Sequence, residues 1–142
     1  IFVGKGDLEI EVLNRAKTLD IQKNIFLLGW RDDIYKLLKS SDAFIFPRLE
    51  YPREGLGLVI IEAQASGLPL FITKGIVDDA IVIKELAFFS DISNNEEIWA
   101  KKILNVLKDN IVIDRKDALD QMEKSVFSLG NGTENLINIY EK

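Results

Sequence analysis

Two glutamates, Glu54 and Glu62, frame the stretch of the chain with the greatest potential for chemistry, with seven residues between them. Between them, Gly55 and Gly57 precede a helix predicted over 58–66. Free backbone N–H groups and the helix dipole make such a helix start an anion site, and glycine lets a phosphate come close. The spacing therefore predicts a phosphate site with Glu54 at its mouth.

Glu62 stands in the middle of a helix that is apolar nearly all round, which indicates a buried helix. At about 100° per residue it shares a face with Leu58, Ile61, Ala65 and Ser66. An unpaired carboxylate that is buried lowers the stability of the fold by roughly several kcal/mol, or it binds a proton and becomes neutral. Two interpretations stay open from the residues alone. One is a salt bridge to a cation elsewhere in the fold, and the other is a carboxylate that accepts two vicinal hydroxyls of a ribose.

The turn that contains Gly4 follows the first predicted strand. Gly4-Lys5-Gly6 resembles the start of a dinucleotide-binding fingerprint, but Glu9 occupies the position of the third glycine. A tight strand-to-helix turn is therefore favoured over direct phosphate contact.

A second loop, 29–33, carries Trp30 and Arg31 at the carboxyl end of another predicted strand. The two side chains could flank a base while backbone groups read its edge, or Trp30 could pack under a neighbouring helix. Lys36, one turn into the next helix, could reach a phosphate or remain a solvated surface lysine.

Short strands alternate with helices along the chain. Strands are predicted at 1–3, 25–28, 43–46 and 70–73, with weaker signals at 81–83 and 87–89. Six helices are predicted: 8–19, 34–40 (or to 41), 58–66, 96–107, 114–127 and 133–140. Asn94 or Asn95 would cap the fourth helix, and Gly130-Asn131-Gly132 separates the last two. This alternation predicts an α/β fold with a Rossmann-like parallel sheet and helices on both faces. Ligands of such sheets bind beyond the carboxyl ends of the strands, which is where these loops lie.

Composition excludes several classes of function. The 142 residues fit one domain, and the net charge of -5 argues against a nucleic-acid binder. With no cysteine and no histidine, disulfides, thiolate nucleophiles, Ser-His or Cys-His dyads and Cys/His zinc sites are excluded. No apolar run approaches the roughly 20 residues of a membrane-spanning helix. We expect a cytoplasmic protein, and the opening strand without a methionine predicts a fragment of a longer chain.

The segment 46–69 resembles the carboxy-terminal signature of the retaining glycosyltransferases of family 4. Its residues are Phe46-Pro47, then Glu54-Gly55-Leu56-Gly57-Leu58-Val59-Ile60-Ile61-Glu62-Ala63-Gln64-Ala65-Ser66-Gly67-Leu68-Pro69. The segments 3–6, 25–29 and 41–47 are similar to the family too, so the match runs from Ile1 to about Glu85. The sequence of 61–69 is closest to exopolysaccharide and capsule transferases, and 99–103 with the closing helices resembles them more loosely.

The resemblance implies one half of a GT-B two-domain architecture, with residues 1–142 as the nucleotide-sugar-binding domain and the amino-terminal acceptor domain absent. Glu54 would be the catalytic residue against the donor sugar, and Gly55-Leu56-Gly57 would offer N–H groups to the pyrophosphate. Glu62 would hold the ribose hydroxyls, with Val59 beside the ribose. Arg31 would contact the base through its backbone, with Trp30 nearby. Leu58, Lys36 and Gly4 complete the predicted substrate-binding set.

The chain departs from the family pattern in three places. The arginine and lysine that grip the pyrophosphate in the family precede the strand seen here at residue 1, and the acceptor site belongs to the absent domain. The loop 48–53 is longer or more charged than the short serine-containing turn of the family.

The function implied is transfer, with retention, of a sugar from a nucleoside diphosphate sugar, UDP-linked, to a glycan or lipid-linked acceptor in polysaccharide biosynthesis. No cofactor, metal or stable protein nucleophile is expected, and the isolated chain should transfer nothing. The full-length protein would be cytoplasmic or peripheral at the inner face of the cell membrane.

Two alternative functions remain. One is a catalytically silent nucleotide-binding or scaffolding module, which should keep its function without Glu54. The other is a sugar-nucleotide epimerase, which the lack of histidine disfavours. A receiver domain would need an acidic pair where Gly4-Lys5-Gly6 stands.

Overall fold

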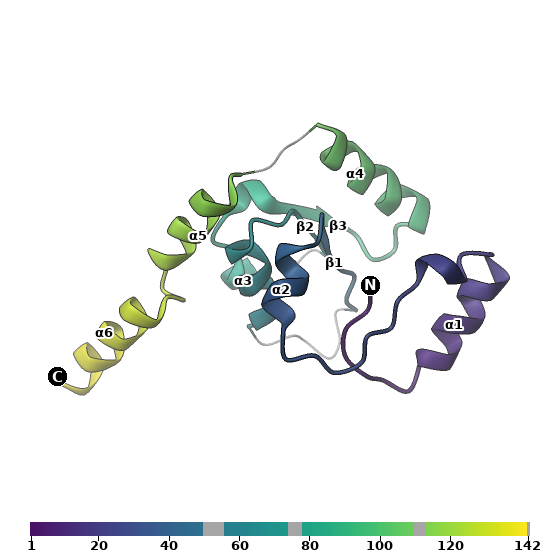
Figure 1. Ribbon diagram of the computed structural model, residues 1–142. Coiled ribbons are helices and arrows are strands. Elements are labelled where there is room, and N and C mark those ends of the chain that lie inside the picture. Colours follow the sequence, from purple (N-terminus) through teal and green to yellow (C-terminus); the bar gives the residue numbers. More distant parts are fainter. Residues whose placement is uncertain (50–55, 74–77, 110–112, 142) are drawn as a thin grey trace. The chain divides into compact units, whose positions relative to one another are not determined.

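The computed structural model describes residues 1–49, 56–73, 78–109 and 113–141 (Figure 1). These residues form two compact units, the amino-terminal unit, Ile1–Ile34, and the sheet unit, Tyr35–Lys142. The expectation that residues 1–142 form one nucleotide-sugar-binding domain stays a prediction.

The amino-terminal unit holds helix α1, Glu9–Thr18, and a short 3-10 helix, Gln22–Asn24. The predicted helix 8–19 is confirmed to within one residue at each end, with acidic residues in its first turn and basic residues in its last. The predicted strands 1–3 and 25–28 are reduced to one parallel bridge, between Phe2 and Leu27. Both runs are ended at once by glycines with positive φ, Gly4 at 114° and Gly29 at 62°, so no longer ladder forms there.

The sheet unit contains three parallel strands, β1 (Phe44–Phe46), β2 (Leu70–Thr73) and β3 (Ala87–Ser90), in the order β1-β2-β3. Its helices are α2 (Ile34–Lys39, which begins at the last residue of the amino-terminal unit), α3 (Leu58–Ala65), α4 (Glu96–Lys108), α5 (Arg115–Glu123) and α6 (Leu129–Tyr140). Two 3-10 turns, Asp78–Ala80 and Lys84–Leu86, precede β3. All of β2 is buried, as expected for a central parallel strand.

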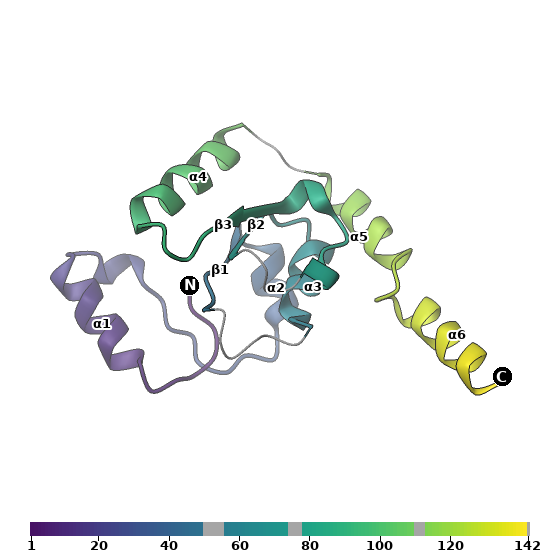
Figure 2. The ribbon, with the colours of Figure 1, turned by 180° about the vertical axis from the view of Figure 1, so that it is seen from behind.

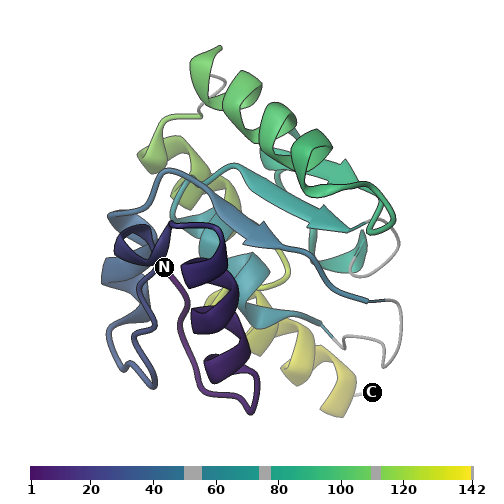
Figure 3. The same cartoon turned by 90° about the vertical axis from the view of Figure 1, so that its right-hand side faces the viewer.

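Helices lie on both sides of these strands, with α4 on one side and α3 on the other (Figures 1, 2 and 3). On the α4 side the core consists of Phe71, Trp99 and Val106, with Ala43, Phe88 and Ile103 packed against them. A second cluster, Ile83, Leu86, Ala118 and Met122, joins α5 to the flank of α3 through Ile61 and Ala65. The predicted α/β class with helices on both faces of a parallel sheet is confirmed.

Three details of the predicted elements are wrong. The helix predicted at 114–127 ends earlier, because α5 stops at Glu123. Residues 81–83 form no strand, because the N–H groups of Val82 and Ile83 both donate to the buried side-chain oxygen of Gln64. Helix α6 begins at Leu129, so Gly130 and Gly132 lie inside it rather than before it. The Ser128 hydroxyl accepts from the Asn131 N–H at 3.2 Å, and this cap outweighs the poor helix propensity of glycine.

Within the ranges that the structure describes, no helix is long and apolar enough to cross a membrane.

Candidate functional site

The carboxyl ends of β1 and β2 meet at the first loop of interest. The backbone N–H of Arg48, which follows β1, donates to the Thr73 hydroxyl at the end of β2 at 3.0 Å, and Thr73 is buried. The loop after β1 therefore starts beside the end of the neighbouring strand, as the topology predicts. Residues 50–55, and with them the predicted site residues Glu54 and Gly55, lie outside the described residues.

Gly57, the residue just before α3, adopts a left-handed backbone conformation. Its φ of 65° and ψ of 60° lie in the left-handed region, where a residue with a Cβ is strained by about 1–2 kcal/mol. Gly57 is buried, and its own side chain offers no oxygen to cap the first N–H groups of α3. The start of α3 thus keeps the donor character predicted for it.

Helix α3 turns one narrow stripe outward. Ile60, Ala63 and Gln64 are buried, Val59 is half-buried, and Leu58 and Glu62, one turn apart, are exposed. Leu58 is 67% exposed although it is apolar. The prediction that Glu62 is buried is therefore wrong: a helix with apolar residues on every side buries only the faces that neighbouring elements cover.

The exposure of Glu62 bears on the two interpretations of its carboxylate. No side-chain hydrogen bond or ion pair joins Glu62 to any other residue within the described part of the chain. An internal salt bridge thus has no support there. The carboxylate is open to a ligand, and its role at a ribose stays a prediction.

Lys36 is exposed on α2, and its ammonium lies 5.7 Å from the centre of the Tyr35 ring. This contact is worth little at an exposed site, so it leaves the lysine available to an anion. Its predicted contact with a phosphate stays a prediction.

The remaining predicted residues lie together in the amino-terminal unit. The Gly4 N–H donates to the Gly29 carbonyl at 2.8 Å, which brings the first glycine turn against the residue that precedes Trp30. Trp30 is 78% exposed, so the alternative that it packs under a helix is wrong. An exposed indole beside a glycine turn is suited to stacking on a flat ring.

The Arg31 guanidinium forms a bidentate pair with Asp33, with both N–O distances at 2.8 Å. The hydrogen bonds and charge of Asp33, helped by the charge of Asp32, raise the pKa of Arg31 above its ordinary value. The pair uses two of the five guanidinium N–H donors, and the Arg31 side chain remains 41% exposed. The contact of the Arg31 backbone with a base, which the family resemblance implies, stays a prediction.

The structure thus brings the predicted site residues together in two groups. Gly57, Leu58, Val59 and Glu62 share one helix end in the sheet unit, and Gly4, Trp30 and Arg31 share one loop pair in the amino-terminal unit.

The sequence analysis missed Gln64. This residue is fully buried, and its amide makes four hydrogen bonds, to the carbonyls of Ile60 and Ala80 and from the N–H groups of Val82 and Ile83. The signal was present: an amide in a helix that is otherwise apolar must find partners if the helix is buried.

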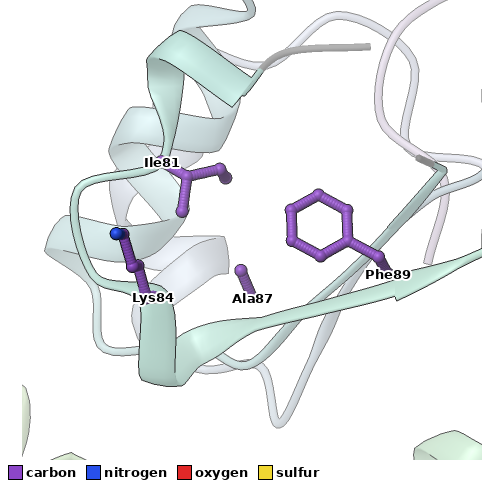
Figure 4. Close-up of a pocket in the computed structure, with 4 residues that line it drawn as sticks. All are labelled: Ile81, Lys84, Ala87 and Phe89. Carbon is purple, nitrogen blue, oxygen red and sulfur yellow. The ribbon is translucent and has the colours of Figure 1, made fainter. Parts of the chain in front are cut away.

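A cavity of about 280 Å³ lies elsewhere in the sheet unit, with Ile81, Lys84, Ala87 and Phe89 around it (Figure 4). Ala87 is the first residue of β3, so the cavity lies towards the amino end of that strand. Because parallel sheets bind ligands at the opposite ends of their strands, we do not assign this cavity to the site. No cluster of acidic residues able to hold a metal ion occurs among the residues described.

The α/β fold matches one part of a GT-B glycosyltransferase. The chain aligns with the crystal structure of WaaG, a glycosyltransferase involved in lipopolysaccharide biosynthesis, with a TM-score of 0.65 over 87% of this chain and 33% of the WaaG chain. At 18% identity this similarity concerns the fold alone.

The family model described as glycosyl transferases group 1 matches residues 1–125, and the chain belongs to this family. It is 32% identical over 113 residues to the UDP-Gal:alpha-D-GlcNAc-diphosphoundecaprenol alpha-1,3-galactosyltransferase of Escherichia coli, covering 79% of this chain and 28% of that protein. It is 31% identical to the putative glycosyltransferase EpsF of Bacillus subtilis, covering 72% of this chain and 26% of EpsF. The chain therefore spans little more than a quarter of the length of these relatives.

Proposed function

We propose that this chain is the donor-binding half of a retaining glycosyltransferase that uses a UDP-sugar and transfers the sugar to a glycan or lipid-linked acceptor in polysaccharide biosynthesis. One observation carries the proposal. Within the segment that matches the family, α3 starts at a left-handed glycine and presents Leu58 and Glu62 outward on one stripe.

Each part of this helix end fits one part of a nucleotide sugar. The N–H groups at the start of α3 and the positive end of its dipole suit the diphosphate. One turn further on, the Glu62 carboxylate can accept hydrogen bonds from two vicinal ribose hydroxyls, and Leu58 and Val59 offer apolar surface beside them. Lys36 adds a cation that suits the phosphates. Taken by itself, the amino-terminal unit offers Trp30 and the backbone of Arg31, which suit a base.

The transfer step places negative charge on the departing diphosphate. Backbone donors aimed at that charge act without reorganisation, and each such donor is worth about 3 kcal/mol in comparable sites. Glu54 would lie against the donor sugar, at the mouth of the same helix end. The proposed step uses no metal and no covalent intermediate on the protein, and retention at the sugar carbon is part of the proposal.

The name of one relative supports the donor and acceptor classes. The Escherichia coli relative is named for a UDP-linked galactose and for an acceptor carried on diphosphoundecaprenol. We therefore place this chain in a protein that works on a UDP-sugar, with the acceptor bound by a further domain at or near the inner face of the membrane. On this account the isolated chain binds nucleotide weakly and transfers no sugar.

Substitution of Glu62 tests the proposal. In the full-length protein, Glu62→Ala should weaken UDP binding by about ten- to a hundredfold in a calorimetric titration, because two hydrogen bonds to a charged acceptor are lost. Glu123→Ala, an exposed glutamate at the end of α5, is the matched control and should bind UDP like the parent protein. Equal affinity of the Glu62→Ala variant and the parent would contradict the proposal.

A further inference from the structure

The Gln64 amide uses its full hydrogen-bonding capacity inside the protein. Its nitrogen donates to the Ile60 carbonyl at 3.1 Å and to the Ala80 carbonyl at 2.7 Å. Its oxygen accepts from the Val82 and Ile83 N–H groups, both at 2.9 Å. A glutamine has two donors and two acceptor lone pairs, so nothing is left unsatisfied. Such a complete set of bonds fixes the side chain in one position.

The bonds join α3 to the segment between the two 3-10 turns. Ala80 and Ile83 are themselves fully buried. The Ala80 carbonyl and the N–H groups of Val82 and Ile83 all bond to Gln64, which therefore holds α3 and residues 80–83 together inside the protein.

Hydrophobic burial alone cannot set how α3 is rotated about its axis. Its apolar side chains are spread almost evenly around the helix, so turning it would bury a similar apolar area. Directional hydrogen bonds to a buried amide do distinguish the rotations, because only one of them brings the amide to Ala80, Val82 and Ile83.

The rotation matters because Gln64 and Glu62 point to opposite sides of the helix. Two residues apart at 100° per residue, their directions differ by about 200°. Holding Gln64 inward therefore holds Glu62 and Leu58 outward, which matches the exposure of both. A helix turned by one residue would carry Glu62 about 100° off that direction.

We propose that Gln64 is a positioning residue for donor binding: its buried amide fixes the rotation of α3 and so presents Glu62 and Leu58 to the nucleotide sugar. This inference rests on the function proposed above and adds the residue that keeps the site oriented.

The test compares two buried substitutions in α3 of the full-length protein. Gln64→Met keeps the length of the side chain and removes all four hydrogen bonds, whereas Ile60→Ala loosens the same helix through a cavity and leaves those side-chain bonds in place. At a temperature where both variants are folded, Gln64→Met should raise KM for the UDP-sugar about tenfold with kcat within about twofold. Ile60→Ala should leave KM unchanged. Equal KM shifts in the two variants would overturn the inference.

A double-mutant cycle with Glu62→Ala separates positioning from stability. If Gln64 acts through Glu62, adding Gln64→Met to Glu62→Ala should weaken UDP binding by less than about twofold further. Fully additive losses would overturn the inference, whereas no effect of Glu62→Ala by itself would count against the proposed function instead. Should Gln64→Met fail to fold, Gln64→Glu, which keeps the acceptors for Val82 and Ile83, replaces it and should show the same coupling.

Discussion

Two glycines, Gly67 and Gly130, differ in how strongly the backbone around them requires glycine. Gly67, which ends α3, has a φ of 68°, and a Cβ at this position would lie 3.0 Å from Cγ and 3.1 Å from Cα of Arg115. Gly130, within α6, has open space around the same point. The two glycines are therefore required to very different degrees.

Alanine substitutions should separate these two positions. We expect Gly67→Ala to lower the free energy of unfolding by about 2 kcal/mol, because it adds both backbone strain and a clash with the start of α5. Gly130→Ala should raise it by about 0.5–1 kcal/mol, since alanine restricts the unfolded chain and suits a helix. Urea denaturation of both variants measures the difference, and a Gly67→Ala variant as stable as the parent would contradict the geometry.

The exposure of Glu62 shows what a sequence pattern leaves undetermined at the scale of one residue. The pattern singled out a carboxylate among aliphatic neighbours and the glycines before it. It could not say which face of α3 is covered, because nearly every face is apolar and the covering groups come from α5 and from residues 80–83. That information lies in contacts between residues distant in sequence.

Elements with strong local signals were predictable. Asn95 caps the start of α4, where its side chain accepts from the Ile98 N–H at 3.1 Å. Asp114 caps the start of α5, where its side chain accepts from the Lys116 N–H at 2.8 Å. Strands β1 and β2 lie within the predicted runs. Caps and continuous apolar runs are local features, so the residues themselves carry them.

Elements that depend on distant partners were not predictable. The apolar run 81–83 has the composition of a strand. The N–H groups of Val82 and Ile83 instead donate to Gln64, which lies 18 residues before Val82 and 19 before Ile83. Likewise, the Arg115 guanidinium donates to the carbonyls of Lys39 and Ser41 at the end of α2. Such contacts join the start of α5 to the end of α2, and neither local sequence contains a pattern that predicts them.

At the scale of the whole molecule, the chain is much shorter than the family relatives that it matches. Residues 1–125 match the family, while the chain covers 28% of the Escherichia coli galactosyltransferase. On the proposed function, the acceptor site and further cations for the diphosphate lie outside these 142 residues.

This division predicts the behaviour of the isolated chain. Incubated with a UDP-sugar and acceptor, it should release no UDP through transfer, because the proposed function places the acceptor site and further cations for the departing diphosphate outside this chain. The full-length protein is the positive control. Sugar transfer by the chain alone, detected on the acceptor, would show that these residues suffice and would contradict this part of the account.

The central claim is that the outward stripe of α3 meets the ribose of a nucleotide. The most direct measurement is a crystal structure of the full-length protein with UDP bound. We predict that both ribose hydroxyls donate to the Glu62 carboxylate at about 2.5–3.0 Å, with the diphosphate at the start of α3 beside Gly57. A bound UDP whose ribose lies away from Glu62, with that carboxylate still facing water, would contradict the claim.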